Sequence, residues 1–488
     1  MDRNIRLLEP RAIWEIFDQI TRIPRPSYHE ERIQDFAFQF GENLGLETIK
    51  DKAGNILIRK PSTPGMESRK GVILQGHLDM VPQKNNDKVH NFVHDPIEAY
   101  IDGGWVTANG TTLGADNGIG VAAALAVLAS KAIEHGPLEV LFTATEETGM
   151  DGAKNLKAGV LRGDILLNMD SEDEGELYVG CAGGEDVGAH FAYAPEAVPG
   201  RSRAFKLEVS GLKGGHSGMD IILQRGNANK VFFRLLNRAY RATGVRLASI
   251  EGGSLRNAIP REAVGILTVE ASMVAELKQI IEAEFELVRT ELSATEPDIK
   301  LIMTETEIPS SVMDEQTQVK LTKSIMACPN GVIRMSDNMP GLVETSGNMA
   351  VVKSDSLAGT VDVSFLIRSS VDSAKADLGS RLHALFTLAG ADVTISGGYP
   401  GWKPNLRSPI LKTMQQVYQN KYGKIPEIKA IHAGLECGIL AGAYPGWDMI
   451  SFGPTIRYPH SPDEKVNIAS VQKFWDFLVE TLKNIPLK

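Results

Sequence analysis

Histidines and carboxylates follow several predicted strands of this 488-residue chain, and such side chains bind divalent metal ions. The residues concerned are His77 and Asp79 in GHLDM, Asp116 in LGADNG, Glu146 and Glu147 in TEETG, Asp170 in NMDSED, and His460 in YPHSPDE. Mixed histidine and carboxylate ligands are typical of catalytic sites for zinc or a similar ion. No two of these residues form a local signature such as HExxH, so the fold would have to assemble the site.

The negative charge of the cluster also favours metal binding. The carboxylates of Asp116, Glu147 and Asp170 carry one negative charge each, which two divalent ions and one bridging hydroxide would neutralise. Without metal, carboxylates that converge on one crevice would repel one another, and their pKa values would rise. The charges therefore suit two ions in a partly enclosed site.

Local geometry predicts a contact between His77 and Asp79 and leaves two roles open for Asp116. His77 and Asp79 are two residues apart, so in extended backbone their side chains point to the same side. Asp79 could then accept the second imidazole N–H of His77 and fix the orientation of a ligating ring. Asp116 comes just before an alanine-rich helix, so it could equally be the N-cap of that helix.

The elements that would position these residues alternate between strand and helix over the first part of the chain. Strands are predicted in GVILQGHLDMV (71–81), PLEVLFTATEE (137–147) and DILLNMD (164–170), and a helix is predicted in NGIGVAAALAVLASKAI (117–133). Ligand sites in open α/β sheets lie beyond the carboxyl ends of the strands, so these three strand ends could face one crevice. The pattern predicts an α/β fold with a mixed central sheet flanked by helices.

The pattern of strand and helix signals in the sequence changes near residue 186. Strand, helix, strand and helix signals follow one another there, and a comparable order recurs from GTVDVSFLIRSS onward. We interpret this region as an α+β insert of two similar lobes that interrupts the α/β domain. The predicted domains are 1–185, the first part of the α/β domain, 186–397, the insert, and 398–488, the second part of the α/β domain.

Composition limits the classes of protein that fit. A net charge of −10 argues against nucleic acid or an anionic membrane as partner. The longest apolar run, residues 118–130, is too short to span a bilayer, and the first residues predict an amphipathic helix with Ile13, Ile16, Phe17 and Ile20 on one face rather than a signal peptide. Three widely spaced cysteines make disulfides unlikely to staple the fold and favour the cytoplasm.

Several motifs, taken in order, resemble those of the aminoacyl-histidine dipeptidases. These are GHLDMV, LGADNGIG, EETGMDGA, NMDSED, KGGHSGMDI (213–221), HAGLECG (432–438) and PHSPDEKV. The family comprises cytosolic dinuclear zinc metallopeptidases related to carnosinases, aminoacylases and peptidase T. The resemblance covers nearly the whole chain, with no departure at a metal or catalytic position.

The resemblance implies a site for two divalent ions, with zinc expected and manganese or cobalt also suited to the ligands. Asp116 would bridge the two ions. His77 and Asp170 would complete the shell of one ion, and Glu147 and His460 the shell of the other. The resemblance also implies a cis peptide bond after the bridging aspartate.

The resemblance assigns catalytic and substrate-binding residues as well. Glu146 would be the general base for a metal-bridging water, and Asp79 would support His77. The resemblance further implies that the insert 186–397 is a lid and that 1–185 and 398–488 form the catalytic metallopeptidase domain. In the lid, His216 would polarise the scissile carbonyl group, while Asn257 and Arg368 would hold the substrate. An arginine suits the free carboxylate of a dipeptide because its planar fork donates two parallel hydrogen bonds.

The leading hypothesis is a metallodipeptidase that cleaves Xaa-His dipeptides, with β-alanyl-histidine as a candidate substrate. An aminoacylase or a broader di- or tripeptidase with the same metals, and a catalytically silent metal- or peptide-binding relative, are the alternatives. Glu146 speaks against the silent relative, because a binding protein needs no base beside the metals. The expected partners are small peptides, and the lid lobes could either pair with a second chain as a homodimer or complete the site within one chain.

Other polar residues have simpler interpretations. His90 and His94 are spaced as an i, i+4 pair, but Pro96 limits any helix, so we expect a loop. His432 and Glu436 either line the pocket or begin a buried helix. The acidic run SEDEGE (171–176) is by default a solvated loop after Asp170, and the cysteines are expected to be core thiols.

Overall fold

The computed structural model describes residues 4–488, which divide into two units. The first unit comprises Met1–Cys181, Trp402–Ala430 and Leu435–Lys488, and the second comprises Ala182–Gly401 and Ile431–Gly434. The sequence prediction did not include the short segment Ile431–Gly434 in the inserted unit. The other predicted domain boundaries stay predictions.

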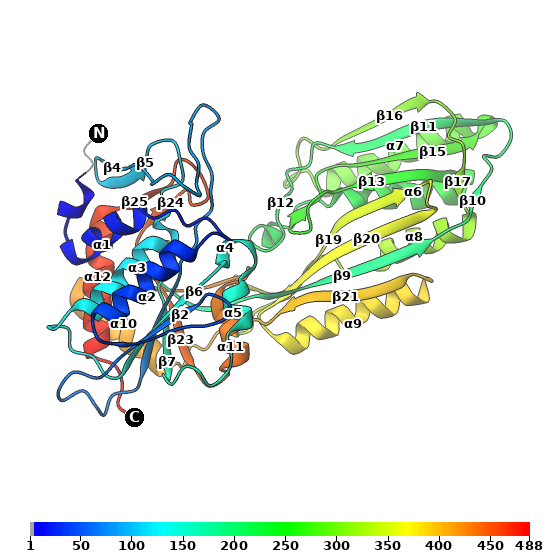
Figure 1. The fold of residues 1–488 in the computed structure, drawn as a ribbon. Helices are drawn as coiled ribbons and strands as arrows, with labels where there is room; N and C mark the ends of the chain where they lie inside the picture. Colours follow the sequence, from blue (N-terminus) through cyan, green and yellow to red (C-terminus); the bar gives the residue numbers. More distant parts are fainter. Residues whose placement is uncertain (1–3) are drawn as a thin grey trace. The chain divides into compact units, whose positions relative to one another are not determined.

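The first unit contains a mixed sheet in the order β1-β2-β6-β3-β7-β23-β8-β22 (Figure 1). Its central strands are parallel, whereas β2 runs antiparallel to β6, and β8 antiparallel to β23. A smaller sheet has the order β24-β25-β5-β4. The strands are β1 Glu47–Lys50, β2 Ile56–Lys60, β3 Val72–His77, β4 Ala99–Asp102, β5 Trp105–Ala108, β6 Leu138–Thr143, β7 Ile165–Asn168, β8 Glu176–Cys181, β22 Glu427–Ile431, β23 Asp448–Ser451, β24 Ile456–Arg457 and β25 Lys465–Asn467.

Helices flank the central sheet of the first unit. The alanine-rich helix α3 packs against β3 and against α1, and α10 packs against β23 and α12. Small side chains let α3 approach the sheet closely, which explains why almost all of its residues are buried. The helices are α1 Arg11–Thr21, α2 Glu31–Asn43, α3 Ala115–Ala129, α4 Glu146–Gly149, α5 Asp151–Asn155, α10 Pro409–Tyr422, α11 Glu436–Ala443 and α12 Ile468–Lys483, with a 3-10 turn at Ile5–Leu7.

The three strands predicted to end in acidic or histidine residues lie next to one another. Strand β3 pairs in parallel with both β6 and β7, and all three are fully buried. Their continuous apolar runs are those expected of strands covered on both faces. Because parallel strands end at the same edge, the residues that follow them share one side of the sheet. The structure confirms the prediction that these three strand ends lie side by side.

The second unit is built on one long sheet in the order β16-β11-β15-β13-β19-β20-β9-β21, with β18 paired to β19. The central pair of this sheet is β13 and β19. Two inner strands and one edge strand follow on each side of that pair. The predicted pair of similar lobes thus takes the form of two halves of one sheet. The strands are β9 Gly183–Ala192, β11 Ser202–Ser210, β13 Arg246–Gly252, β15 Ala263–Glu270, β16 Lys300–Thr306, β18 Gly331–Met335, β19 Val343–Asp355, β20 Thr360–Ser369 and β21 Asp392–Tyr399, with short pairs β10 Pro195–Glu196 with β17 Val312–Met313 and β12 Gly215–His216 with β14 Ala258–Ile259.

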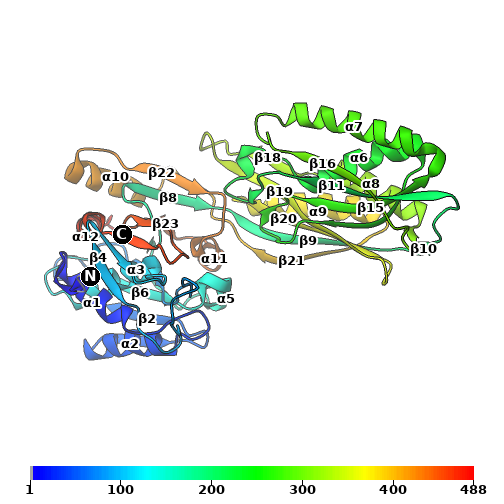
Figure 2. The same ribbon diagram turned by 90° about the horizontal axis from the view of Figure 1, so that it is seen from above.

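Helices of the second unit share one hydrophobic core with this sheet. Helix α9 contributes Phe386, which contacts Phe191 of β9 and Phe365 of β20. Helix α7 runs along the half that contains β15, β11 and β16 in both views (Figure 1, Figure 2). The helices are α6 Ala228–Thr243, α7 Val274–Glu291, α8 Glu315–Ala327 and α9 Asp372–Leu388, with 3-10 turns at Ile221–Leu223 and Ala271–Met273.

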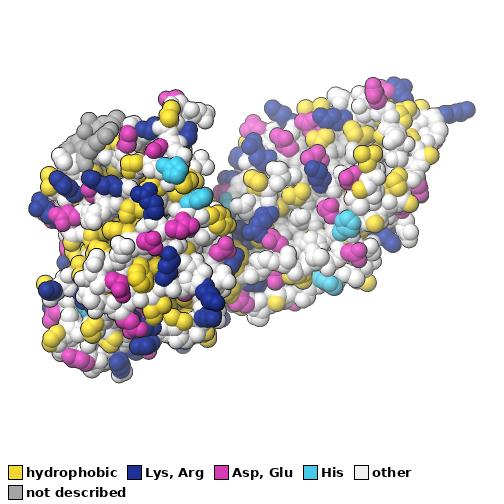
Figure 3. Space-filling model, viewed as in Figure 1, with side chains coloured by type: hydrophobic (Ala, Val, Ile, Leu, Met, Phe, Trp, Pro, Cys, Tyr) yellow, Lys and Arg dark blue, Asp and Glu magenta, His cyan; other side chains and the backbone are white. Residues whose placement is uncertain are grey.

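The observed architecture confirms the predicted fold class, an α/β domain with a mixed central sheet and an α+β insert. Helix α1 buries Ile13, Ile16, Phe17 and Ile20, as its periodicity predicts. Figure 3 shows acidic and basic side chains interspersed over the visible face of each unit. Within residues 4–488, no helix is both long and apolar enough to cross a membrane.

Candidate active site

The five residues predicted as metal ligands lie together in the first unit. One carboxylate oxygen of Asp116 lies 3.1 Å from Nε2 of His77, and the other lies 3.3 Å from Nε2 of His460. Asp170 approaches Nε2 of His77 at 3.3 Å, and Glu147 approaches Nε2 of His460 at 3.0 Å. The residues therefore form two groups, each with one histidine, and the groups share Asp116.

The chemistry of these groups fits divalent ions. In each group the candidate ligand atoms all lie within 4.8 Å of one another, which is close enough for one ion to contact them together. Oε1 of Glu147 is buried and has no hydrogen-bond partner among residues 4–488, and such an oxygen suits a cation. His77, Glu146 and Glu147 form a further group of this kind, so Glu146 also lies beside the candidate centre.

The carboxylates around the imidazoles of His77 and His460 favour protonated rings when no metal is bound. Burial lowers the pKa of His77, but the carboxylates of Asp170, Asp116 and Asp79 outweigh it and hold that pKa well above its ordinary value. Hydrogen bonds from its ring to the carboxylates of Asp116 and Glu147 raise the pKa of His460 to about 11. A bound metal ion requires these rings to be neutral, so metal binding would release protons.

The carboxyl groups differ in the direction of their pKa shifts. Burial tends to raise the pKa of Asp116, yet hydrogen bonds from His460 and His77 hold it well below its ordinary value. Burial raises the pKa of Asp170 to about 6 against the opposing charge of His77. Burial also raises the pKa of Glu146 well above its ordinary value, with His77 again opposing and Asp170 reinforcing the rise. Burial therefore favours the protonated form of Glu146 when no metal is bound.

Asp79 organises more of the site than the predicted contact with His77. Its Oδ1 lies 3.3 Å from Nδ1 of His77, and its two oxygens accept the backbone N–H groups of Glu146 at 3.0 Å and Glu147 at 3.1 Å. The hydroxyl group of Ser27 donates to it at 2.7 Å. Despite complete burial, which raises a carboxyl pKa, these donors and His77 lower the pKa of Asp79 to about 2. A permanently ionised Asp79 thus fixes both the histidine and the paired glutamates.

A strained turn precedes the two glutamates. Thr145, just before the one-turn helix α4, has a φ of 56°, in the left-handed region that few non-glycine residues adopt. Glu30 accepts both the backbone N–H and the hydroxyl of Thr145, at 2.9 and 2.8 Å, and so holds this conformation. Both glutamates then lie in the group with His77, and Glu147 also contacts His460.

Asp116 does not cap the alanine-rich helix. Its carboxylate oxygens face Nε2 of His77 and Nε2 of His460 rather than the backbone N–H groups of the helix. The N-cap alternative is therefore wrong. The expected cis peptide bond between Asp116 and Asn117 is present.

Sequence analysis missed several residues of this region. Glu464 accepts the backbone N–H groups that precede and include Asp116, and Arg25 donates to carbonyl groups around them. Glu172 was expected in a solvated loop, but burial and the charges of Asp116 and Asp170 raise its pKa to about 8. The only signal in the sequence was proximity along the chain, since Glu172 follows Asp170 and Glu464 follows His460 by a few residues.

Glu436 belongs to a buried hydrogen-bond network below the candidate ligands. It begins α11, as one alternative held, and its Oε2 accepts from Nε2 of Gln75 at 2.6 Å and from the hydroxyl of Thr143 at 2.7 Å. Asn168 donates in turn to Gln75. Burial raises the pKa of Glu436 to about 7. The network joins the strands β3, β6 and β7 just before the points where they deliver their site residues.

The predicted lid residues lie together within the second unit. Strands β12 and β14 bring His216 opposite Ala258, and the backbone N–H of Ser217 donates to the carbonyl of Asn257 at 2.8 Å. Nδ1 of His216 accepts two backbone N–H groups, from Gly218 at 3.1 Å and Met219 at 3.0 Å. Because Nδ1 is an acceptor, the neutral ring carries its proton on Nε2. Burial and the charge of Arg368 lower the pKa of His216, which favours this neutral, donating form.

Arg368 is a buried cation with weak partners. It is 5% exposed, and it donates only to hydroxyl groups, those of Ser217 at 3.4 Å and Tyr399 at 3.2 Å. Among residues 4–488, no carboxylate lies within ion-pair distance of it. A buried guanidinium without an anion is costly, so the site suits an anionic ligand group. His432 is also buried in this unit, where its Nε2 pairs with the hydroxyl of Ser346 at 2.7 Å.

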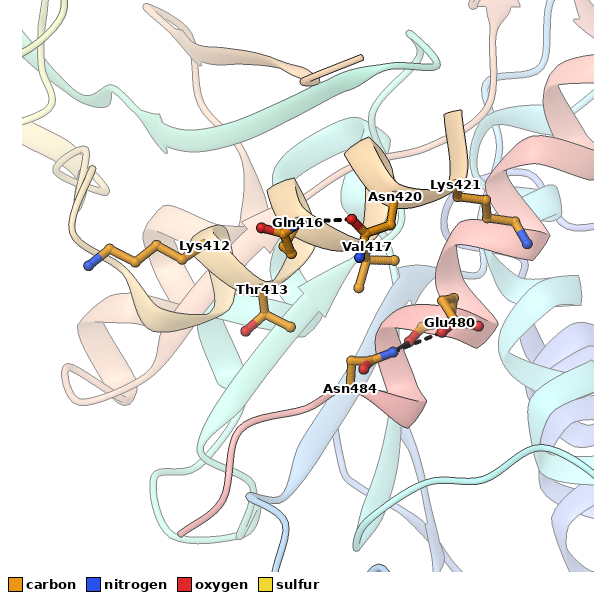
Figure 4. A pocket seen from close by; sticks show the side chains of 8 residues that line it. All are labelled: Lys412, Thr413, Gln416, Val417, Asn420, Lys421, Glu480 and Asn484. Carbon is orange, nitrogen blue, oxygen red and sulfur yellow. Dashed lines mark hydrogen bonds between the residues drawn. The ribbon is translucent and has the colours of Figure 1, made fainter. Parts of the chain in front are cut away.

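Other candidate positions lie apart from these clusters. His90 and His94 lie outside helices and strands, as expected. A polar hollow between α10 and α12 is drawn in Figure 4, where Gln416 bonds to Asn420 and Asn484 to Glu480. Since these polar groups pair with one another, the hollow adds nothing to the candidate chemistry.

Comparisons with known proteins place this geometry in context. The family model for "Peptidase family M20/M25/M40" matches residues 73–484. The Cytosol non-specific dipeptidase of Escherichia coli (strain K12) is 49% identical over 481 residues, covering 99% of this chain and 99% of the relative. The crystal structure of aminoacylhistidine dipeptidase from Vibrio alginolyticus is 49% identical, covers 99% of both chains and superimposes with a TM-score of 0.95.

More distant structures share the fold alone. Aminopeptidase PepT from Bacillus cereus is 15% identical, with a TM-score of 0.57 over 98% of this chain and 99% of that chain. The similarities therefore extend over nearly the entire chain, from close relatives to distant ones.

Proposed function

The chain belongs to peptidase family M20/M25/M40, and on this premise we propose that it is a metal-dependent hydrolase that cleaves dipeptides. One observation carries the proposal: the two oxygens of Asp116 face different histidines, and each histidine has a second carboxylate beside it. This arrangement favours two ions that share Asp116, with zinc as the expected metal and manganese or cobalt as alternatives.

The chain's own residues supply the remaining parts of a hydrolytic site. When bound, divalent ions would polarise the scissile carbonyl group and lower the pKa of water at the site. Glu146 would accept the proton of the attacking water and deliver it to the leaving amine, because it lies beside the ligand groups and burial raises its pKa. Asp79 would hold His77 and the backbone of both glutamates in place.

The second unit supplies groups suited to a peptide. We assign the scissile carbonyl group to Nε2–H of His216, the free carboxylate to Arg368, and further contact to Asn257. The neutral tautomer of His216 and the unpaired charge of Arg368 support these roles. Small peptides are therefore the proposed partners. Pairing with a second chain as a homodimer stays a prediction, which a molar mass from light scattering tests.

The substrate range has two candidates. The name of the Vibrio relative favours Xaa-His dipeptides, including β-alanyl-histidine, whereas the name of the Escherichia coli relative favours a broader range. The cytosolic relative also supports a cytoplasmic location. A panel of dipeptides that differ only in the second residue separates the two: histidine dipeptides alone should be cleaved in the first case, and most members in the second.

The experiment that tests the proposed chemistry uses protein of measured metal content and the Glu146→Ala variant. The variant should retain the metal ions of the wild type and lose hydrolysis of Xaa-His dipeptides by about 100- to 10,000-fold, the range of general acid–base catalysis. Unchanged turnover would remove Glu146 from the mechanism. Hydrolysis of no member of the panel by metal-loaded wild type would overturn the proposed function.

A further inference from the structure

Glu464 is a buried carboxylate whose partners are backbone N–H groups of the segment that ends in Asp116. Its Oε2 accepts from Leu113 at 2.8 Å and Gly114 at 2.9 Å, and its Oε1 accepts from Ala115 at 2.8 Å and Asp116 at 3.2 Å. The residue is 2% exposed. Both oxygens therefore accept hydrogen bonds from this one segment, which lies 348 residues or more from Glu464 in the sequence.

The segment forms a concave row of donors that fits one carboxylate. Gly114 has a φ of 72° and a ψ of 31°, and such a left-handed residue turns successive N–H groups toward one point. Arg25 fixes the opposite side of the backbone, since it donates to the carbonyl groups of Gly114, Leu78 and Asp79. The segment is thus held through both its N–H and its C=O groups.

Glu464 also belongs to the loop that carries His460. The backbone N–H of Glu464 donates to the carbonyl of Ser461 at 3.0 Å, and its own carbonyl accepts the hydroxyl of Thr107 at 2.8 Å. At the other end of this loop, Nε2 of His460 lies 3.3 Å from Asp116. One short loop therefore contacts the backbone of Asp116 through Glu464 and its carboxylate through His460.

We propose that Glu464 is a positioning residue of the metal centre: by holding residues 113–116 it sets Asp116 at the distance from His460 that a shared pair of ions requires. The inference rests on the proposed function in so far as that function needs the ions. The side chain of His460 itself is half exposed, whereas Glu464 at the other end of the loop is buried.

Glutamine is the informative replacement. Glu464→Gln keeps the shape and one acceptor oxygen, but its amide NH2 would face two N–H donors that would lose their acceptor. The segment would then shift, and Asp116 with it. Loss of a group that orients ligands lowers metal affinity by about 10- to 100-fold.

A purely structural carboxylate of the same unit serves as the matched control. Glu139 is buried; its Oε2 accepts the backbone N–H groups of Arg162 at 2.6 Å and Gly163 at 2.9 Å, and its Oε1 accepts from Nε of Arg59 at 2.9 Å, none of which is a candidate ligand. Glu139→Gln therefore makes the same chemical change away from the centre. Both variants should lower the free energy of unfolding of the metal-free protein, but only Glu464→Gln should weaken metal binding.

The test titrates chelator-treated full-length protein with Co²⁺ and follows visible absorption, with Zn²⁺ stoichiometry from equilibrium dialysis. We expect Glu464→Gln to raise the dissociation constant of at least one ion by about 10- to 100-fold and to change the Co²⁺ spectrum, while Glu139→Gln stays within about threefold of wild type. Wild-type affinity and spectrum in Glu464→Gln, or equal weakening in both variants, would overturn the inference.

Two further outcomes are distinguishable. If wild type binds no divalent ion, the proposed metal site itself fails, whereas unaltered binding by Glu464→Gln overturns only the role of Glu464. If Glu464→Gln does not fold, Glu464→Asp takes its place, because it retains the charge and shortens the reach by one methylene group. The same loss of affinity is then expected, and wild-type affinity in Glu464→Asp would contradict the inference.

Discussion

At the scale of single residues, Arg368 has a charge that its own unit does not neutralise. Its two hydrogen bonds, to Ser217 and Tyr399, go to uncharged hydroxyl groups. A substrate carboxylate could supply the missing anion and accept two parallel N–H groups. Arginine rather than lysine suits such a carboxylate, because only the guanidinium offers the planar fork.

We predict that Arg368→Ala raises KM for dipeptides by about 10- to 100-fold, since a hydrogen bond to a charged group contributes about 1.5–3 kcal/mol. C-terminally amidated analogues, which lack the carboxylate, should change far less. Arg256→Ala is the control, because Arg256 pairs with Asp186 and its side chain is 57% exposed. Steady-state kinetics of both substrate types decide the matter, and an equal loss for both would show that Arg368 does not bind the carboxylate.

Glu436 gives a prediction about pH. Burial raises its pKa in the folded protein to about 7 from an ordinary value of 4.5. A raised pKa contributes stability that is complete below the ordinary value and is lost as the pH rises through the folded-state value. Glu436→Gln lacks this titration and keeps an acceptor for Gln75 and Thr143.

The free energy of unfolding of metal-free Glu436→Gln should therefore improve relative to wild type between about pH 5 and pH 8, by up to about 3 kcal/mol. Urea unfolding at several pH values measures this difference. If the free energy of unfolding depended on pH in the same way in variant and wild type, Glu436 would not titrate in this range in the folded protein.

At the scale of elements, the start of α3 combines backbone strain with close packing. Gly114 has a φ of 72°, and a Cβ added there would lie 2.5 Å from Nη2 of Arg25 and 2.9 Å from Sδ of Met80. Glycine is needed at this position both for the backbone conformation and for the approach of Arg25. A side chain would push Arg25 away from the carbonyl groups that it binds.

We expect Gly114→Ala to lower the free energy of unfolding by about 2–4 kcal/mol, from left-handed strain of about 1 kcal/mol plus overpacking. Gly45→Ala is the matched control, because Gly45 has a φ of 71° but nothing lies within 4 Å of an added Cβ. Urea unfolding of the metal-free proteins should show only the strain in the control. Equal losses in the two variants would show that the contact with Arg25 contributes nothing.

The elements also show what the sequence could predict. The buried strands before His77, Glu146 and Asp170 could be found, because continuous apolar runs and the polar residues after them are local features. The predicted strand 137–147 is too long, since β6 ends at Thr143 and Glu146 begins α4. The row of N–H groups around Glu464 could not be found, since it depends on a left-handed glycine and on a loop far away in the sequence. The N-cap alternative for Asp116 was consistent with local sequence and failed because tertiary contacts with two histidines dominate.

At the scale of the whole molecule, the chain crosses between units in a way that composition does not reveal. Segment Ile431–Gly434 belongs to the second unit, while Leu435 and the helix that follows belong to the first. His432 and Glu436 therefore serve different units, although one motif contains both. The assignment of roles to His216, Asn257 and Arg368 came from resemblance, because these residues lie on separate elements: His216 on the short strand β12, Asn257 on the turn before β14, and Arg368 near the end of β20.

Metal ions held by the Asp116 groups should be required for dipeptide hydrolysis. The most direct test measures hydrolysis of a Xaa-His dipeptide while metal is removed by a chelator and Zn²⁺ is then returned stepwise, with bound metal measured at each step. Activity should fall to about 1% or less and return with bound metal to a plateau at about two ions per chain. Full activity at less than about 0.1 ion per chain would contradict the account.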